Sequence, residues 1–218
     1  MFRKTLVTAL LLAGLNTTAL CAPANLDEAI VEVAHHWAKV SYQIPEAERE
    51  AAFRGVINES QRIAQAFPGK AEPLIWQAIV LSSAAKAQGG LGALSKVKEA
   101  RELLLSAEKI NPTALDGSIY NSLGSLYAKV PGWPIGFGDK KKAREYLEKA
   151  LTINPNGIDP NYFYADLLVD LGEYAKATEH LKRALAAPPR LHREDADAGR
   201  RQDIQHLLDS IRQKQAGK

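Results

Sequence analysis

One four-residue motif recurs three times along the 218-residue chain, and it constrains the fold more than any other feature. Two alanines, a leucine and a proline keep the same spacing in each copy: Ala100, Leu104, Ala107 and Pro112; Ala143, Leu147, Ala150 and Pro155; Ala177, Leu181, Ala184 and Pro189. The second and third copies are 34 residues apart, and the first precedes the second by 43. A period near 34 residues indicates stacked helical units, which bury their apolar faces against one another.

The central copy, Leu123 to Pro155, adds Gly124 and Tyr127 at further helix-packing positions. With these residues, the chain resembles the tetratricopeptide repeat family over residues 71–189, as three units. The resemblance implies an all-α fold, a right-handed α-solenoid of antiparallel helix pairs in which the first helix of each pair lines a concave surface. It also implies that this surface binds an extended peptide or a partner helix.

The segments that flank the three units lack the full motif. Residues 25–70 have the form of a helix pair without the consensus residues, which predicts a degenerate unit that closes the N-terminal end. Residues 190–218 are predicted to form a capping helix with a frayed tail, because apolar residues recur at helical spacing after a charged segment. In that charged segment, residues 190–201, we expect local surface salt bridges. The predicted helix caps include Asn25, Asp139 and Asp159.

Residues 1–24 have the layout of a secretory signal peptide, in which two basic residues precede an apolar run and small residues follow. We expect cleavage after Cys21 or Ala24. A lipoprotein would keep Cys21 as an acylated first residue, but the bulky Leu20 before it disfavours a lipid anchor. The chain is therefore predicted to be exported to the periplasm.

Composition excludes several classes of function. The single cysteine is Cys21, at the predicted cleavage site, so the mature chain would have neither a disulfide nor a thiolate metal ligand. Removing two basic residues with the signal lowers the formal charge from +3 to +1, which gives no electrostatic case for nucleic acid. The most apolar later stretch, residues 74–85, is too short and too often interrupted to span a membrane.

Two Gly-rich insertions depart from the family pattern. They occupy residues 88–92 and 130–139, each between the two helices of a unit. Because equivalent turns of a solenoid fall on one edge, we expect the insertions to lie side by side and to form a binding lip. Trp133 and Phe137 offer flat contact area in the longer insertion. The alternative is that the rings fold back and fill the core of the loop, which we expect for at least one of them.

The predicted partner-binding residues combine this loop with the concave helices. Trp133 and Phe137 come from the loop. The resemblance supplies the others by position: Asn121, Ser125, Lys129, Tyr162, Asp166, Val169 and Asp170. The basic clamp by which some family members bind chaperone C-termini is absent from these positions.

No catalytic, metal or cofactor site is predicted, and the chain is not expected to be an enzyme. His36 lies beside His35 and four residues after Glu32, but a metal site needs further ligands and the other histidines are distant in sequence. Asp166 and Asp170 are one helical turn apart, and no nucleophile accompanies them. Contact with a partner, or a solvated face, is therefore favoured over acid–base chemistry.

These observations predict an exported scaffold that binds a polypeptide segment along its concave helices, with the Gly-rich loops closing one edge. The alternative is a periplasmic accessory protein that binds a small solute for a transport system. It rests on loop composition, which is similar to that of the tetratricopeptide component of some TRAP transporters. A scaffold predicts an open groove exposing Tyr162 and Val169, whereas a solute binder predicts an enclosed cavity near Trp133.

Overall fold

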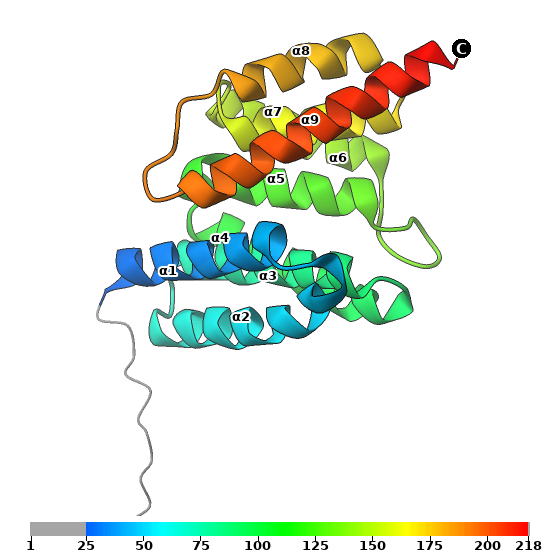
Figure 1. The fold of residues 1–218 in the computed structure, drawn as a ribbon. Coiled ribbons are helices and arrows are strands. Elements are labelled where there is room, and N and C mark those ends of the chain that lie inside the picture. The colour runs from blue at the N-terminus through cyan, green and yellow to red at the C-terminus, as the bar shows by residue number, and fades with distance from the viewer. Residues whose placement is uncertain (1–24, 218) are drawn as a thin grey trace, which may run out of the picture.

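The computed structural model describes residues 25–217, which form nine α-helices and no strand (Figure 1). The helices are α1 (Leu26–Ala38), α2 (Glu46–Ala66), α3 (Ala71–Gln88), α4 (Leu94–Ile110), α5 (Ala114–Lys129), α6 (Lys140–Ile153), α7 (Ile158–Asp170), α8 (Tyr174–Leu185) and α9 (Glu194–Ala216). A π-helix (Lys39–Gln43) continues α1, and a 3₁₀ helix (Leu91–Ala93) precedes α4. The all-α prediction is confirmed, while the predicted signal peptide lies outside the described residues.

Successive helices form antiparallel pairs: α1 with α2, α3 with α4, α5 with α6, and α7 with α8. The pairs stack, because α5 contacts both helices of the pair before it and α7 does the same. This is the α-solenoid arrangement that the repeated motif predicts. Within the described part of the chain, no helix has the length and apolarity that crossing a bilayer requires.

The motif residues form the contacts within each pair. Leu104, Leu147 and Leu181 are fully buried, as are the alanines that flank them in the motif. Gly124 of α5 shows why one position must be small: a Cβ atom there would lie 2.5 Å from Cγ of Leu147 on α6. The two helices can approach this closely only because Gly124 has no side chain.

The helix starts agree with two of the three predicted caps. The Asn25 side chain accepts a hydrogen bond of 2.8 Å from the backbone N–H of Glu28, and Asp139 accepts two from the first turn of α6. The third prediction is wrong, because Gly157 is the N-cap of α7 and Asp159 lies inside its first turn. The Asp159 carboxylate binds arginine side chains instead.

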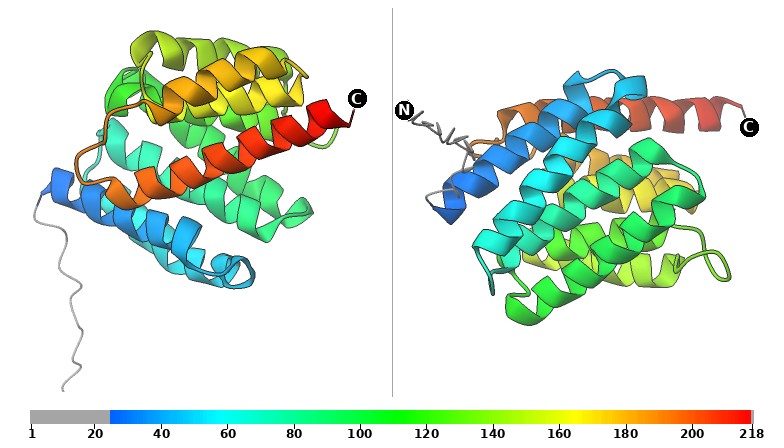
Figure 2. Two further views of the ribbon diagram at one scale, coloured as in Figure 1. Left: turned by 45° about the horizontal axis from the view of Figure 1, so that its top comes forward. Right: turned by 90° about the horizontal axis from the view of Figure 1, so that it is seen from below.

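The last helix, α9, does more than cap the stack. Its residues Ile204 and Ile211 belong to the main core beside α7 and α8, whereas Ala196 belongs to the separate core of the N-terminal helices. Figure 2 shows α9 crossing the molecule from its start beside α1 to its end beside α8. One helix therefore joins the first pair of the solenoid to the last, which the sequence did not predict.

Candidate functional site at the turn edge

The turns inside the pairs α3–α4, α5–α6 and α7–α8 lie along one edge of the molecule (Figures 1 and 2). We call this edge, made of residues 89–93, 130–139 and 171–173, the turn edge. The two Gly-rich insertions share it, as expected from solenoid geometry. Large apolar side chains are exposed at all three turns: Leu91, Trp133, Ile135 and Leu171.

The longest turn, residues 130–139, is held in place by its own backbone. Asp139 donates its N–H to the carbonyl of Tyr127 at 2.9 Å, and Gly138 donates to the carbonyl of Pro131 at 3.0 Å. A Cβ atom at Gly138 would lie only 1.9 Å from the carbonyl oxygen of Val130, so the two ends of the loop pass each other too closely for any side chain. The loop is therefore an ordered element, and glycine is needed for its closure.

Phe137 folds back onto the solenoid, which confirms the prediction that at least one ring would do so. Its ring meets that of Tyr127 edge to face, with centroids 5.3 Å apart, and Tyr127 stacks in turn on Tyr146 of α6 at 5.5 Å. The guanidinium of Arg101 lies 4.4 Å from the centre of the Phe137 ring. Since Arg101 belongs to α4, Phe137 also ties the loop to the preceding unit.

Trp133, in contrast to Phe137, does not fold back onto the solenoid. Its side chain is 90% exposed at the tip of the same loop. An indole on a loop that is already ordered has little conformational freedom left to lose when it is covered. The two aromatic residues therefore have different roles. Phe137 fixes the loop, and Trp133 is presented to solvent.

A polar cluster lies directly beside the loop, and it brings together three of the predicted site residues. Nζ of Lys129, at the end of α5, is 2.9 Å from carboxylate oxygens of both Asp166 and Asp170 on α7. Nζ of Lys140, at the start of α6, is also 2.9 Å from Asp170. Burial raises the pKa of the Asp170 carboxyl, but hydrogen bonds from the two lysines outweigh this effect and hold the pKa below its usual value.

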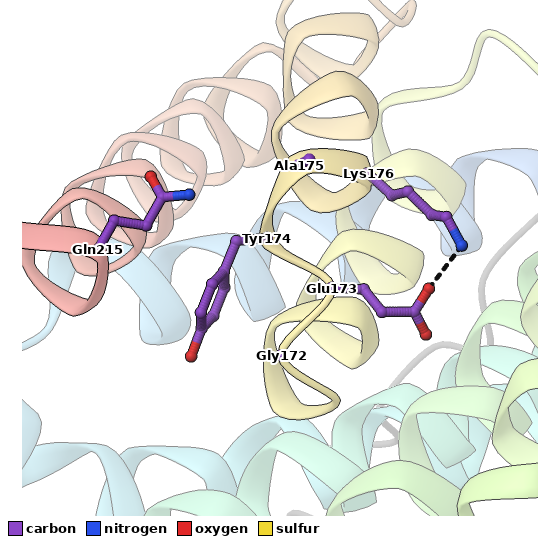
Figure 3. Close-up of a pocket in the computed structure, with 6 residues that line it drawn as sticks. All are labelled: Gly172, Glu173, Tyr174, Ala175, Lys176 and Gln215. Carbon is purple, nitrogen blue, oxygen red and sulfur yellow. Dashed lines mark hydrogen bonds and ion pairs between the residues drawn. The ribbon is translucent and has the colours of Figure 1, made fainter. Parts of the chain in front are cut away.

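A shallow depression of about 360 Å³ continues the edge where the end of α9 approaches the start of α8 (Figure 3). It is lined by Gly172, Glu173, Tyr174, Ala175, Lys176 and Gln215. A second depression lies beside α1. Neither includes a residue of the loop 130–139, so neither is the enclosed cavity near Trp133 that a solute binder predicts.

The concave face is less open than the sequence suggested. Asn121 and Val169 are both buried, and Ser125 is partly buried. The ring of Tyr162 is half-buried, with the guanidinium of Arg200 of α9 4.4 Å from its centre. An open groove exposing Tyr162 and Val169 is therefore not found, because α9 packs against α7 and Val169 faces the core.

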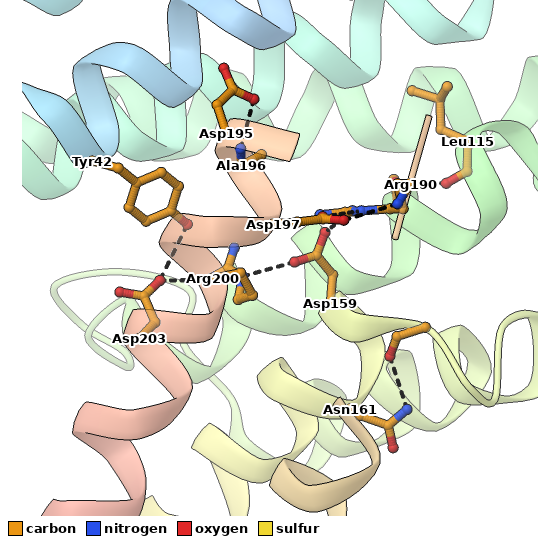
Figure 4. Close-up of polar contacts among 12 residues, drawn as sticks. Tyr42, Leu115, Asp159, Asn161, Arg190, Asp195, Ala196, Asp197, Arg200 and Asp203 are labelled. Carbon is orange, nitrogen blue, oxygen red and sulfur yellow. Dashed lines mark hydrogen bonds and ion pairs between the residues drawn. The ribbon is translucent and has the colours of Figure 1, made fainter. Parts of the chain in front are cut away.

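A partly buried ionic network holds α9 against α7 (Figure 4). The Asp159 carboxylate of α7 accepts hydrogen bonds from Nε of Arg200 at 2.8 Å and from Nη1 of Arg190 at 2.6 Å. Arg190 also binds Asp197, and Tyr42 of the π-helix donates its hydroxyl to Asp203 at 3.2 Å. Arg190 and Arg200 thus form local salt bridges, with Asp197 and Asp203, as expected, but these pairs are partly buried and both arginines also bind Asp159 of α7.

Comparisons with known proteins agree with the repeat architecture. The tetratricopeptide repeat family model matches residues 135–214, which is less than half of the chain. This match supports tetratricopeptide repeats from α6 through α9. Comparison with curated proteins gives no match.

The chain is also similar to several solved structures. A thermophilic TPR protein of Thermus thermophilus is 16% identical, with 86% of this chain and 98% of that chain covered and a TM-score of 0.46. The pilF protein of Pseudomonas aeruginosa is 16% identical, with 85% and 90% covered and a TM-score of 0.35. MamA is 19% identical, with 64% and 91% covered and a TM-score of 0.34. Because the sequence identities and the TM-scores are low, these similarities support no inference about function.

Proposed function

We propose that this chain is an interaction scaffold that binds a polypeptide partner at the turn edge. The tetratricopeptide match supports a protein-binding role in general, since repeats of this kind act as binding scaffolds. The observation that carries the specific proposal is Trp133, which is 90% exposed on a loop held by hydrogen bonds and by the buried face of Phe137. Exposed tryptophan on an ordered loop is the kind of residue that dominates binding energy at interfaces.

The surroundings of Trp133 have the composition of an interface. Leu91, Ile135 and Leu171 extend the apolar surface along the edge, and the cluster of Lys129, Lys140 and Asp170 borders it with charges of both signs. An apolar centre with a polar border is the usual anatomy of a protein–protein contact. Of the predicted site residues, Lys129, Trp133 and Asp170 belong to the proposed surface and Phe137 holds its loop in place, whereas Asn121 and Val169 are buried in the fold. The partner is therefore a polypeptide segment with apolar side chains.

Export is part of the proposal and rests on the sequence of residues 1–24. An exported scaffold meets its partner in the periplasm, so the experiment must be done in the compartment to which the chain is delivered. Neither of the two depressions described above includes a residue of the loop 130–139, so neither supports the solute-binding alternative. A small retained mass in native mass spectrometry of the protein taken from the periplasm would nevertheless favour that alternative and count against the scaffold.

Site-specific crosslinking tests the proposal directly. A photoreactive phenylalanine analogue replaces Trp133 in one variant and Gln65 in the control, since Gln65 is exposed at the end of α2, on the opposite side from the turn edge. After illumination of host cells, we expect a discrete protein adduct at position 133 and none at position 65. Equal labelling at both positions, or none at position 133, would reject a partner at the turn edge.

A further inference from the structure

A separate cluster of metal-ligating side chains lies in the N-terminal helix pair, outside the turn edge. Glu32 and His36 are one turn apart on α1, and Glu59 faces them from α2. The ligand atoms of the three residues all lie within 4.8 Å of one another. The closest are Nδ1 of His36 and Oε2 of Glu59, at 2.8 Å.

We propose that Glu32, His36 and Glu59 bind a divalent transition-metal ion, with Zn²⁺ as the ion that the donors fit. An imidazole nitrogen and carboxylate oxygens are zinc ligands, at bond lengths of about 2.0–2.2 Å. Two ligands at such distances around a tetrahedral ion are separated by roughly 3–4 Å. The atoms of His36 and Glu59 would move apart only slightly to admit the ion, and the carboxylate of Glu32, within 4.8 Å of both, would be the third ligand.

The helix pair holds the donors in position. His36 and Glu59 both lie within regular helices, and the distance between α1 and α2 is set by buried residues such as Val33, Phe53 and Val56. The Glu59 side chain is 17% exposed and the His36 side chain 47% exposed, so the carboxylate is mostly covered while the imidazole stays accessible. A site built on packed helices needs no folding step to form.

The surface beside the cluster leaves room for the rest of the coordination sphere. A depression of about 530 Å³ is lined by Glu32 and His36 together with Asp27, Glu28, Val31, His35 and His192. Three protein ligands leave a coordination position that water can fill from this depression. His35 is not one of the proposed ligands, because it is not among the three residues whose ligand atoms lie together, and its Nδ1 is paired instead with the carboxylate of Asp195 on α9. It therefore serves as a neighbouring control.

Calorimetric titration of Zn²⁺ into the untagged protein, purified from cells that express the complete sequence, tests the assignment. We expect one ion per chain and a melting temperature that rises with zinc, since a ligand of the folded state stabilises it. Mg²⁺, which prefers octahedral oxygen coordination, should give neither effect. Absence of zinc binding by the unaltered protein would overturn the proposal.

Variants identify the ligands. His36→Ala and Glu59→Gln should each weaken zinc binding by more than the roughly 10- to 100-fold loss that follows removal of an outer-shell partner. His35→Ala and His206→Ala, the latter an exposed histidine of α9, should retain the affinity of the unaltered protein. Circular dichroism without metal verifies that every variant is folded. Unchanged affinity in His36→Ala, or an equal loss in His35→Ala, would contradict the assignment.

Discussion

Nε of Arg200 lies 2.8 Å from Oδ1 of Asp159, and this contact joins α9 to the first turn of α7. Burial by itself raises the pKa of the Asp159 carboxyl, but the charges of Arg190, Arg200 and Arg193 outweigh it and hold the pKa far below its usual value. The Arg200 guanidinium also lies over the ring of Tyr162 at 4.4 Å, so that ring is enclosed between α7 and α9. The position of α9 across the stack thus depends on a partly buried charge pair as well as on apolar contacts.

Replacing Asp159 should destabilise the fold strongly. Asp159→Ala leaves Arg190 and Arg200 without their shared carboxylate, and because these side chains are partly buried we expect a loss above that of a surface pair and at most the about 3–5 kcal/mol of a fully buried one. Urea unfolding monitored by circular dichroism measures the change in the free energy of unfolding. Glu102→Ala is the matched control, because its pair with Arg101 is on the surface and should contribute less than about 1 kcal/mol. Similar losses in the two variants would contradict the role given to Asp159.

Asp159 should also make the free energy of unfolding depend on pH in the acid range. Because the Asp159 pKa is lower in the folded than in the unfolded state, its contribution is complete above the unfolded value of about 3.9 and is lost as the pH falls toward the folded value. The free energy of unfolding should therefore decrease between about pH 5 and pH 2. Asp159→Asn should flatten this decrease. Parallel pH profiles for the variant and the unaltered protein would show that Asp159 does not contribute.

Two glycines should respond to the same substitution in opposite ways. A Cβ atom at Gly199 of α9 would lie 2.2 Å from the ring of Tyr42, whereas one at Gly55 of α2 would have no neighbour within 4 Å. Gly199→Ala should lower the free energy of unfolding by about 1–3 kcal/mol, as overpacking does. Gly55→Ala should raise it by about 0.5–1 kcal/mol, since alanine is the better helix former. Denaturant titration compares them, and equal effects would mean that α9 does not contact Tyr42.

Tryptophan fluorescence should report the exposure of the loop. The chain has three tryptophans, and Trp37 and Trp76 are only 8% and 2% exposed, against 90% for Trp133. Iodide, a charged quencher that does not enter the core, should quench one component of the emission. Trp133→Phe should remove that component and change stability by less than about 0.5 kcal/mol, as is usual for surface substitutions. Persistence of the quenchable component would show that the loop is packed differently.

The ion pairs that Lys129 and Lys140 form beside the loop should affect the pKa of Asp170. Lys129→Ala removes one of the two lysines that stabilise the Asp170 carboxylate, so the pKa of that carboxyl should rise toward its usual value. Lys140 remains and should keep the shift incomplete. Side-chain NMR titration measures the pKa, with Lys98→Ala of the exposed face of α4 as the control. An unchanged Asp170 pKa in Lys129→Ala would contradict the ion pair.

The repeated motif determined the helix pairs from α3 to α8, because each pair is built from contacts between residues close in sequence. Gly124 and Leu147 illustrate this, since their spacing in the motif alone indicates that they pack together. The turn edge followed from the same periodicity, and the composition of the longer insertion identified it as a candidate site. Sequence could not say which aromatic ring would fold back, because that choice depends on the aromatic surface that Tyr127, Tyr146 and Arg101 create together.

How the two ends of the chain meet follows from tertiary packing. Contacts such as Tyr42 with Gly199 join residues more than 150 positions apart, and they depend on the superhelical path summed over four helix pairs. No local sequence pattern encodes that path. The burial of Arg200, and the packing of α9 over the surface where an open groove was expected, could therefore not be predicted. Glu59 was missed for a different reason: it comes from α2, and the first helix pair lacks the repeat motif that would predict how its two helices face each other.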